Sequence, residues 1–120
     1  MISFRGSVNS KNWITNMNFN MESYKNIAGA EVHEGFYAAY KSVSSQVISA
    51  VKALKTAHPK ATYLITGYSL GGAIATFAGV DIKTTLGVTT KMSMYTFGSP
   101  RTGNQAFSNF VFKQFSTQGY

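Results

Sequence analysis

The strongest constraint on the fold is the stretch around Ser69, which reads Gly-Tyr-Ser-Leu-Gly and has the pattern Gly-x-Ser-x-Gly. An apolar run at residues 61–65 precedes it, and an alanine-rich amphipathic stretch at residues 70–82 follows it. In this context the pattern predicts a nucleophile elbow, a sharp strand-to-helix turn that lifts the serine hydroxyl above a sheet. Gly67 and Gly71 suit such a turn because the strand and helix backbones come close together there.

A serine presented in this way predicts a serine hydrolase. The Ser69 Oγ would attack an ester carbonyl and form an acyl-enzyme. Donors that are already in place stabilise the charge that develops on the carbonyl oxygen, and the elbow makes the backbone N–H of Leu70 one of them. We expect no cofactor and no metal in this chemistry, and the absence of cysteine excludes a thiol nucleophile. The alternative is a tight structural turn without a catalytic role.

Short apolar runs at residues 1–4, 61–66 and 92–97 predict strands. The last two runs are nearly continuous, as expected for parallel strands that are covered on both faces. They alternate with stretches that have the spacing of helices, so the order is strand and helix in turn. This order predicts an α/β fold with a mostly parallel sheet and right-handed crossovers. No linker or repeat divides residues 1–120, and we expect one domain.

Three helices are expected between and after these strands. Apolar residues recur in steps of three and four from Phe36 to Leu54, which predicts a helix with one apolar face. His58 and the proline after it should end this helix, because proline disfavours helical geometry in the residue before it. The second helix is the one that leaves the elbow. A third is indicated around Phe107, Phe110 and Val111.

The charge is unbalanced, with eleven Lys plus Arg against four Asp plus Glu and a net charge of +7. The lysines are dispersed from Lys11 to Lys113, which favours an ordinary solvated surface. Attraction to anionic lipid is the second interpretation. Nucleic-acid binding is disfavoured, because neither a basic cluster nor a recognition motif is present. No apolar run reaches the about 18–20 residues of a transmembrane segment, and no signal peptide precedes the first expected strand.

Four segments together resemble the fungal-type (class 3) lipases of the α/β-hydrolase superfamily. They are Phe-Arg-Gly-Ser at 4–7, Val-His-Glu-Gly-Phe at 32–36, the Gly-Tyr-Ser-Leu-Gly-Gly stretch at 67–72, and Tyr-Thr-Phe-Gly-Ser-Pro-Arg-Thr-Gly-Asn at 95–104. The family more often has histidine where Tyr68 stands. The resemblance extends through essentially all 120 residues. It implies a partial α/β-hydrolase fold and a hydrolase of acylglycerols or related carboxylic esters.

The resemblance also implies two further parts of the site. Ser7 would supply the second oxyanion donor; the alternative is an ordinary turn at the end of a strand. Residues 8–19 would form a lid, which in the family is a helical flap that opens at a lipid–water interface. In this segment Trp13, Ile14 and Met17 would share one face of a short helix capped by Ser10. A surface helix whose tryptophan belongs to the core is the alternative.

The acid and the base that normally activate the serine are not found in the expected place. This fold has its triad in the order Ser, acid, His, yet no histidine follows Ser69. Asp81 is the only acid after it, and twelve residues of helix place it about 18 Å away. We expect His33 and His58 to be structural. In the family the triad Asp and His come after the segment that ends at Asn104.

We therefore interpret the 120 residues as the central piece of a lipase domain with both ends absent, and we expect the chain alone to be essentially inactive on esters. The function predicted for the complete domain is that of a carboxylic ester hydrolase, in the first place a triacylglycerol lipase. Phospholipase A1-like and feruloyl esterase activities are close neighbours. A non-catalytic protein that binds lipid surfaces is the alternative from another class. The resemblance implies proteins that are often secreted, but the compartment of this chain is left open.

Overall fold

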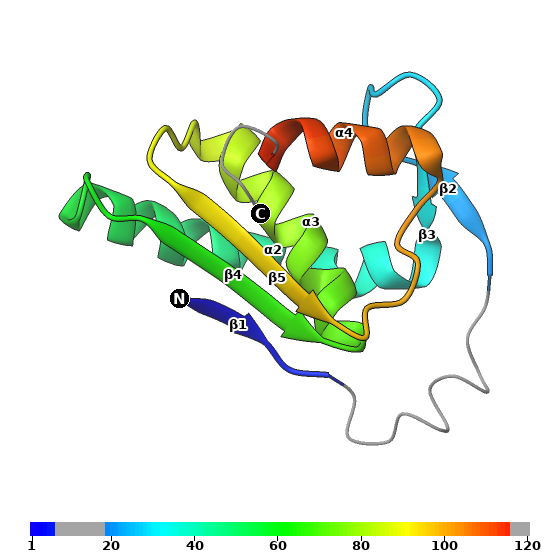
Figure 1. The fold of residues 1–120 in the computed structure, drawn as a ribbon, viewed down its shortest axis with the longest axis horizontal. Coiled ribbons are helices and arrows are strands. Elements are labelled where there is room, and N and C mark those ends of the chain that lie inside the picture. Colours follow the sequence, from blue (N-terminus) through cyan, green and yellow to red (C-terminus); the bar gives the residue numbers. More distant parts are fainter. Residues whose placement is uncertain (7–18, 116–120) are drawn as a thin grey trace.

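The computed structural model describes residues 1–6 and 19–115. Its centre is a parallel sheet of three strands in the order β1-β4-β5 (Figure 1). The strands are β1 (Ile2–Phe4), β4 (Tyr63–Tyr68) and β5 (Met92–Phe97). The predicted bounds of β5 are confirmed, and β4 begins and ends two residues later than predicted. All three strands point toward the edge of the sheet where Ser69 lies.

The three predicted helices are present as α2 (Glu34–Ala57), α3 (Leu70–Leu86) and α4 (Gln105–Phe115). The predicted end of α2 is confirmed, because its C-cap is His58. Helix α3 continues beyond the predicted stretch to Leu86, and its C-cap Gly87 has a φ of 60°, the left-handed conformation that ends many helices. The α/β fold is thus confirmed. None of the helices within the described residues is long and apolar enough to cross a membrane.

Helix α3 connects the sheet to the other helices. It packs against all three strands on one side, and α2 and α4 pack against it (Figure 1). The strand side chains Ile65 and Met94 face α3 at Gly79, where the helix has no side chain to keep them away. This close packing of α3 on the sheet holds the start of α3, and with it Ser69, at the edge of the sheet.

A hairpin that the sequence did not indicate precedes α2. Its strands β2 (Met21–Ser23) and β3 (Glu31–His33) are antiparallel and form a separate two-stranded sheet. Each has only three residues, which is too short for an alternating pattern to be recognised. The hairpin is attached to the loop after β5, because the His33 N–H donates to the Thr102 carbonyl oxygen (2.8 Å) and Val32 pairs with Gly103.

Aromatic rings fill the space between the hairpin and the three helices. Phe77 of α3 is at the centre, with its ring centroid 5.0 Å from that of Tyr37 and 5.5 Å from that of Phe107. The rings of Tyr24 and Phe107 meet edge to face at 4.9 Å, a geometry favoured by aromatic pairs. We call this group the aromatic cluster: Tyr24, Tyr37, Tyr40, Phe77, Phe107 and Phe110.

One expectation about the sheet is wrong. The apolar runs predicted strands covered on both faces, but aromatic side chains near the ends of β4 and β5 are exposed: Tyr68 by 67%, Tyr95 by 52% and Phe97 by 60%. The strand register places Tyr68 beside Phe97. Figure 1 shows α2 and α3 behind the sheet, and among the described elements it is α3 that packs against these strands. Within the described residues, one face of the two strands is buried against α3, and the other has exposed rings near the strand ends.

Candidate active site

Ser69 occupies a strained turn between β4 and α3. Its φ of 57° and ψ of −124° are rare for a residue with a side chain, and such a conformation costs on the order of 1–3 kcal/mol. Two hydrogen bonds of 2.9 Å hold it: the Ser69 N–H donates to the Phe97 carbonyl oxygen, and the Gly72 N–H donates to the Ser69 carbonyl oxygen. The strand–turn–helix geometry predicted for this segment is present, with Ser69 half-buried.

Backbone-to-backbone contacts surround this turn and leave no room for side chains at its two glycines. A Cβ on Gly67 would overlap the carbonyl group of Gly71 in the first turn of α3. A Cβ on Gly71 would overlap the carbonyl group of Phe4 at the end of β1. The requirement for glycine at both positions is therefore steric, as the sequence pattern indicated.

The chain leaves β1 directly beside Ser69. A Cβ on Gly6 would lie 2.7 Å from the Tyr68 carbonyl oxygen and 3.4 Å from the Ser69 Cβ. Leu70 is the first residue of α3, and backbone N–H groups in the first turn of a helix have no partner within that helix. The Leu70 N–H is therefore suited to the oxyanion role predicted for it. Ser7 and the lid residues Trp13, Ile14 and Met17 lie outside the described residues, so their roles remain predictions.

Both histidines are at the ends of α2. His33 is its N-cap, with Nδ1 accepting a hydrogen bond from the Phe36 N–H at 3.2 Å and the two rings stacked at 3.8 Å. His58 is its C-cap and lies just before β4, at the end of that strand opposite Ser69. These positions agree with the structural roles expected for the two residues.

Asp81 of α3 forms polar contacts with α2 and with the turn between β2 and β3. Its carboxylate accepts hydrogen bonds from the Tyr40 hydroxyl (2.5 Å) and the Thr85 hydroxyl (2.8 Å), and it pairs with Lys25 at 3.3 Å. Burial opposes its ionisation, but these hydrogen bonds and the lysine charge outweigh burial and hold the pKa of Asp81 below its usual value. Burial and the hydrogen bond to Asp81 raise the pKa of Tyr40.

A largely apolar cavity of about 590 Å³ lies between the hairpin, the start of α2 and the loop after β5. We call it the hairpin cavity. The loop that forms one wall also touches the elbow, because Ser99 lies against Gly72. The sequence did not indicate this cavity, since its walls come from three separate stretches of the chain. Its lining residues are Phe19, Met21, Glu31, His33, Phe36, Pro100, Arg101, Gly103 and Asn104.

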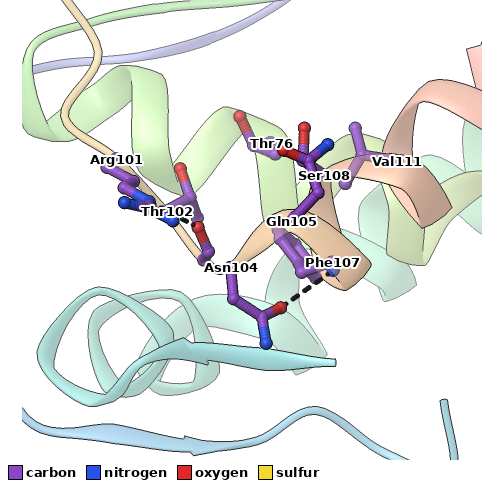
Figure 2. A pocket seen from close by; sticks show the side chains of 9 residues that line it. Thr76, Arg101, Thr102, Asn104, Gln105, Phe107, Ser108 and Val111 are labelled. Carbon is purple, nitrogen blue, oxygen red and sulfur yellow. Dashed lines mark hydrogen bonds between the residues drawn. The ribbon is translucent and has the colours of Figure 1, made fainter. Parts of the chain in front are cut away.

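A second cavity of about 460 Å³ lies on the other side of the same loop, against α3 and α4 (Figure 2). Its lining is mixed, with polar side chains such as Thr76 and Ser108 beside the apolar Phe107 and Val111. Asn104 lines both cavities. Its Oδ1 caps α4 by accepting from the Phe107 N–H (3.0 Å) and also accepts from the Glu31 N–H (3.1 Å). Within residues 1–6 and 19–115, no three His, Cys, Asp or Glu side chains are grouped to hold a metal ion.

Comparison with known proteins shows which family the chain resembles. The family model described as Lipase (class 3) matches residues 1–120. The chain is 44% identical over 114 residues to the secreted mono- and diacylglycerol lipase 1 of Fusarium solani, covering 95% of this chain and 33% of that protein. It is 38% identical over 110 residues to a lipase of Rhizopus niveus, covering 90% of this chain and 28% of that protein.

Solved structures agree with the sequence comparison. A lipase from Rhizopus microsporus var. chinensis superimposes with a TM-score of 0.84 at 36% identity, over 92% of this chain and 39% of that one. The Rhizomucor miehei triacylglyceride lipase has a TM-score of 0.84 at 29% identity, over 93% of this chain and 44% of that one. The chain spans about a third of the length of the curated relatives it matches.

Proposed function

The chain belongs to the class 3 lipase family, and on that premise we propose that it carries the nucleophile and oxyanion donors of a carboxylic ester hydrolase. Acylglycerols, and triacylglycerol in the first place, are the proposed substrates, because the named relatives are an acylglycerol lipase and a triacylglyceride lipase. The observation that carries the proposal is the strained conformation of Ser69 at the start of α3, fixed by glycine contacts on both sides.

In the proposed reaction, the Ser69 Oγ attacks the ester carbonyl, the serine proton passes to the leaving alcohol oxygen, and an acyl-enzyme forms; water then hydrolyses the acyl-enzyme and releases the acid. The carbonyl oxygen becomes negatively charged and is stabilised by the Leu70 N–H at the N-terminus of α3, together with Ser7. Replacing Ser7 by alanine should lower kcat roughly 10²–10³-fold in the complete domain if its hydroxyl donates. A loss under about threefold would reduce Ser7 to a backbone donor or a turn residue.

We assign the acyl chain of the substrate to the hairpin cavity. Its walls include the apolar side chains of Phe19, Met21, Phe36 and Pro100, and burial of a hydrocarbon chain against them is favourable. The loop after β5 borders both places: its Ser99 lies against Gly72 in the first turn of α3, and its residues 100–104 form one wall of the cavity.

The base that Ser69 needs is not among its described neighbours, because His33 and His58 are the caps of α2. We propose that an acid and a histidine from additional polypeptide complete the site, and that the 120 residues alone are essentially inactive. Hydrolysis of a nitrophenyl ester at about 1 s⁻¹ or more by the chain alone, abolished by Ser69→Ala, would contradict this. His33 would then be the first residue to replace.

The deciding experiment is covalent labelling by an organophosphonate in a chimera that supplies the flanking sequence of a class 3 relative. Labelling and ester hydrolysis should be lost in Ser69→Ala, with kcat lower by several orders of magnitude and folding intact. Ser99→Ala is the matched control, because Ser99 is an exposed serine beside the same turn and should remain labelled. Labelling that persists in Ser69→Ala would refute the assignment.

A second candidate is a non-catalytic protein that binds lipid surfaces. The exposed rings of Tyr68, Tyr95 and Phe97 and the net charge of +7 favour it. Binding to anionic vesicles without phosphonate labelling in the chimera would select this function. Within the enzyme class, phospholipase A1-like and feruloyl esterase activities would share the same nucleophile, and hydrolysis of a panel of esters would rank them.

A further inference from the structure

Tyr68, the last residue of β4, carries its side chain on the face of the sheet that α3 leaves open. Ile65 and Gly67 of the same strand lie against α3, and successive residues of a strand point to opposite faces. The Tyr68 ring is 67% exposed and directly precedes Ser69 in the chain. The ring therefore lies beside the turn that holds the proposed nucleophile.

The part of this ring nearest the strand lies close to the backbone at two positions that are far apart in the sequence. A Cβ added to Gly6 would lie 3.5 Å from the ring Cδ1, and a Cβ added to Gly98 would lie 3.4 Å from Cε2 and 3.9 Å from Cδ2. Cδ1 belongs to one edge of a tyrosine ring, and Cδ2 and Cε2 belong to the other edge. One edge of the ring thus faces the chain leaving β1, and the other faces the start of the loop after β5.

The same two backbone positions border Ser69. Gly6 lies against the turn, because an added Cβ would be 2.7 Å from the Tyr68 carbonyl oxygen and 3.4 Å from the Ser69 Cβ. Phe97, the residue before Gly98, accepts the hydrogen bond from the Ser69 N–H (2.9 Å). A strained backbone conformation such as that of Ser69 persists only where several surrounding contacts hold it. The ends of β1 and β5 provide two of these contacts, and the Tyr68 ring lies between them.

We propose that Tyr68 is a positioning residue for Ser69, whose ring keeps the ends of β1 and β5 in place on either side of the nucleophile turn. The inference rests on the proposed function, because it takes Ser69 as the nucleophile. The ring carbons near the strand do this, and the hydroxyl group is not needed. Without the ring, both strand ends can shift and the Ser69 Oγ can move from its attacking position. A misplacement of about 1 Å in a catalytic group can lower the rate as much as 10²-fold.

The first test is hydrogen exchange of the 120-residue chain, followed by NMR, and it does not depend on catalysis. The Ser69 and Gly72 N–H groups form the two hydrogen bonds of the turn, so their protection factors report how often the turn opens. We expect Tyr68→Ala to lower both protection factors about tenfold and Tyr68→Phe to leave them within about twofold. Tyr95→Ala is the matched control and should leave them unchanged. Tyr95 is an exposed ring on the neighbouring strand, but it is not among the nearest neighbours of either glycine.

The second test is ester hydrolysis by the chimera that supplies the flanking sequence of a class 3 relative. Tyr68→Ala should lower kcat about tenfold and leave KM within about twofold, because the ring acts on the nucleophile and not on the substrate. Tyr68→Phe and Tyr95→Ala should both retain kcat. Should Tyr68→Ala fail to fold, nuclear Overhauser effects in the unmodified chain decide. The ring protons of Tyr68 should then show contacts to the α-protons of both Gly6 and Gly98, and their absence would refute the proposed placement.

Unchanged protection of the turn in Tyr68→Ala would overturn the inference, as would an equal loss in Tyr95→Ala. A loss of kcat in Tyr68→Phe as large as in Tyr68→Ala would assign the effect to the hydroxyl group and would also overturn it. A raised KM with an unchanged kcat would make Tyr68 a substrate contact instead. Failure of the nucleophile assignment is a separate result, seen as phosphonate labelling that survives Ser69→Ala, and it would leave the hydrogen-exchange result standing.

Discussion

Around Ser69 the chain is packed backbone against backbone, whereas on the far side of α3 it is packed side chain against side chain. At the elbow, Gly67 and Gly71 bring β4, α3 and β1 into direct contact. Behind α3, the rings of the aromatic cluster fill the space between the hairpin and the helices. Rings can adjust by rotation and small shifts, but a backbone contact cannot. The comparison indicates that geometry is most tightly held where the nucleophile is proposed.

The largest effect should come from adding one methyl group at the elbow. In Gly71→Ala the new Cβ would meet the Phe4 carbonyl group and lie 2.9 Å from the Arg5 carbonyl carbon. We expect the free energy of unfolding to fall by about 3 kcal/mol or more, because no side chain can move aside. Urea unfolding followed by circular dichroism measures this.

Gly87→Ala is the control for that change. Gly87 has a positive φ of 60°, but nothing lies within 4 Å of an added Cβ, so only the backbone preference is lost, at about 1–2 kcal/mol. A cost for Gly71→Ala no greater than for Gly87→Ala would remove the distinction between the two regions.

A smaller loss of stability is expected at Asn104, whose side chain joins the hairpin to the start of α4. Asn104→Ala removes the cap of α4, the bond to the Glu31 N–H and the bond from Nδ2 to the Gly29 carbonyl oxygen (2.8 Å). We expect a loss of about 2 kcal/mol in urea unfolding. Gln105→Ala removes only an exposed bond to Asn109 and should change stability by less than about 0.5 kcal/mol. Equal costs would show that the hairpin does not depend on Asn104.

Replacing a ring of the aromatic cluster by a smaller side chain should reduce stability less than adding a methyl group at Gly71. Phe77 is 1% exposed at the centre of the cluster, and we expect Phe77→Leu to cost about 1.5 kcal/mol as the surrounding rings adjust. Thermal unfolding compares it with Phe112→Leu on the exposed face of α4, which should shift little. If Phe77→Leu destabilises as much as Gly71→Ala, the cluster is as rigid as the elbow.

The smallest effect should appear in acid. The lowered pKa of Asp81 means that the unfolded chain binds a proton more readily than the folded one. The stabilisation is therefore complete above the ordinary pKa of 3.8 and is lost as the pH falls through the folded pKa. Tyr40→Phe removes a hydrogen bond that lowers this pKa, so stability should depend less on pH between 5 and 3, by under about 1 kcal/mol. An unchanged slope would exclude Asp81 as its source.

The parts of the fold that were predicted correctly have local causes. Continuous apolar residues marked β5, the proline after His58 marked the end of α2, and two glycines around a serine marked the elbow. Each cause acts within a few residues, so it can be recognised in the sequence. This was sufficient to predict the turn at Ser69 and the start of α3 at Leu70, whose catalytic roles remain predictions.

The features that were not predicted depend on contacts between distant segments. The hairpin strands are short, and Asn104 and the loop after β5 hold them in place. The hairpin cavity brings Phe19, Phe36 and Pro100 together from separate elements, so no local pattern indicates it. The exposed rings at the ends of β4 and β5 were mistaken for buried ones, because a run of apolar residues does not show which face of a sheet a helix covers.

The pairing of β1 with β4 has a consequence for the order in which the molecule is assembled. Ile2 is paired with Ile65, so the hairpin and all of α2 lie between the two strands in the chain. Contacts between distant residues form slowly, whereas helices and hairpins form within microseconds. On the ribosome, β1 emerges before β4 and cannot pair until β4 has been made. The contact between β1 and the turn at Ser69 therefore forms late. In a chain stalled before residue 72, the elbow is incomplete and β1 cannot pack against it.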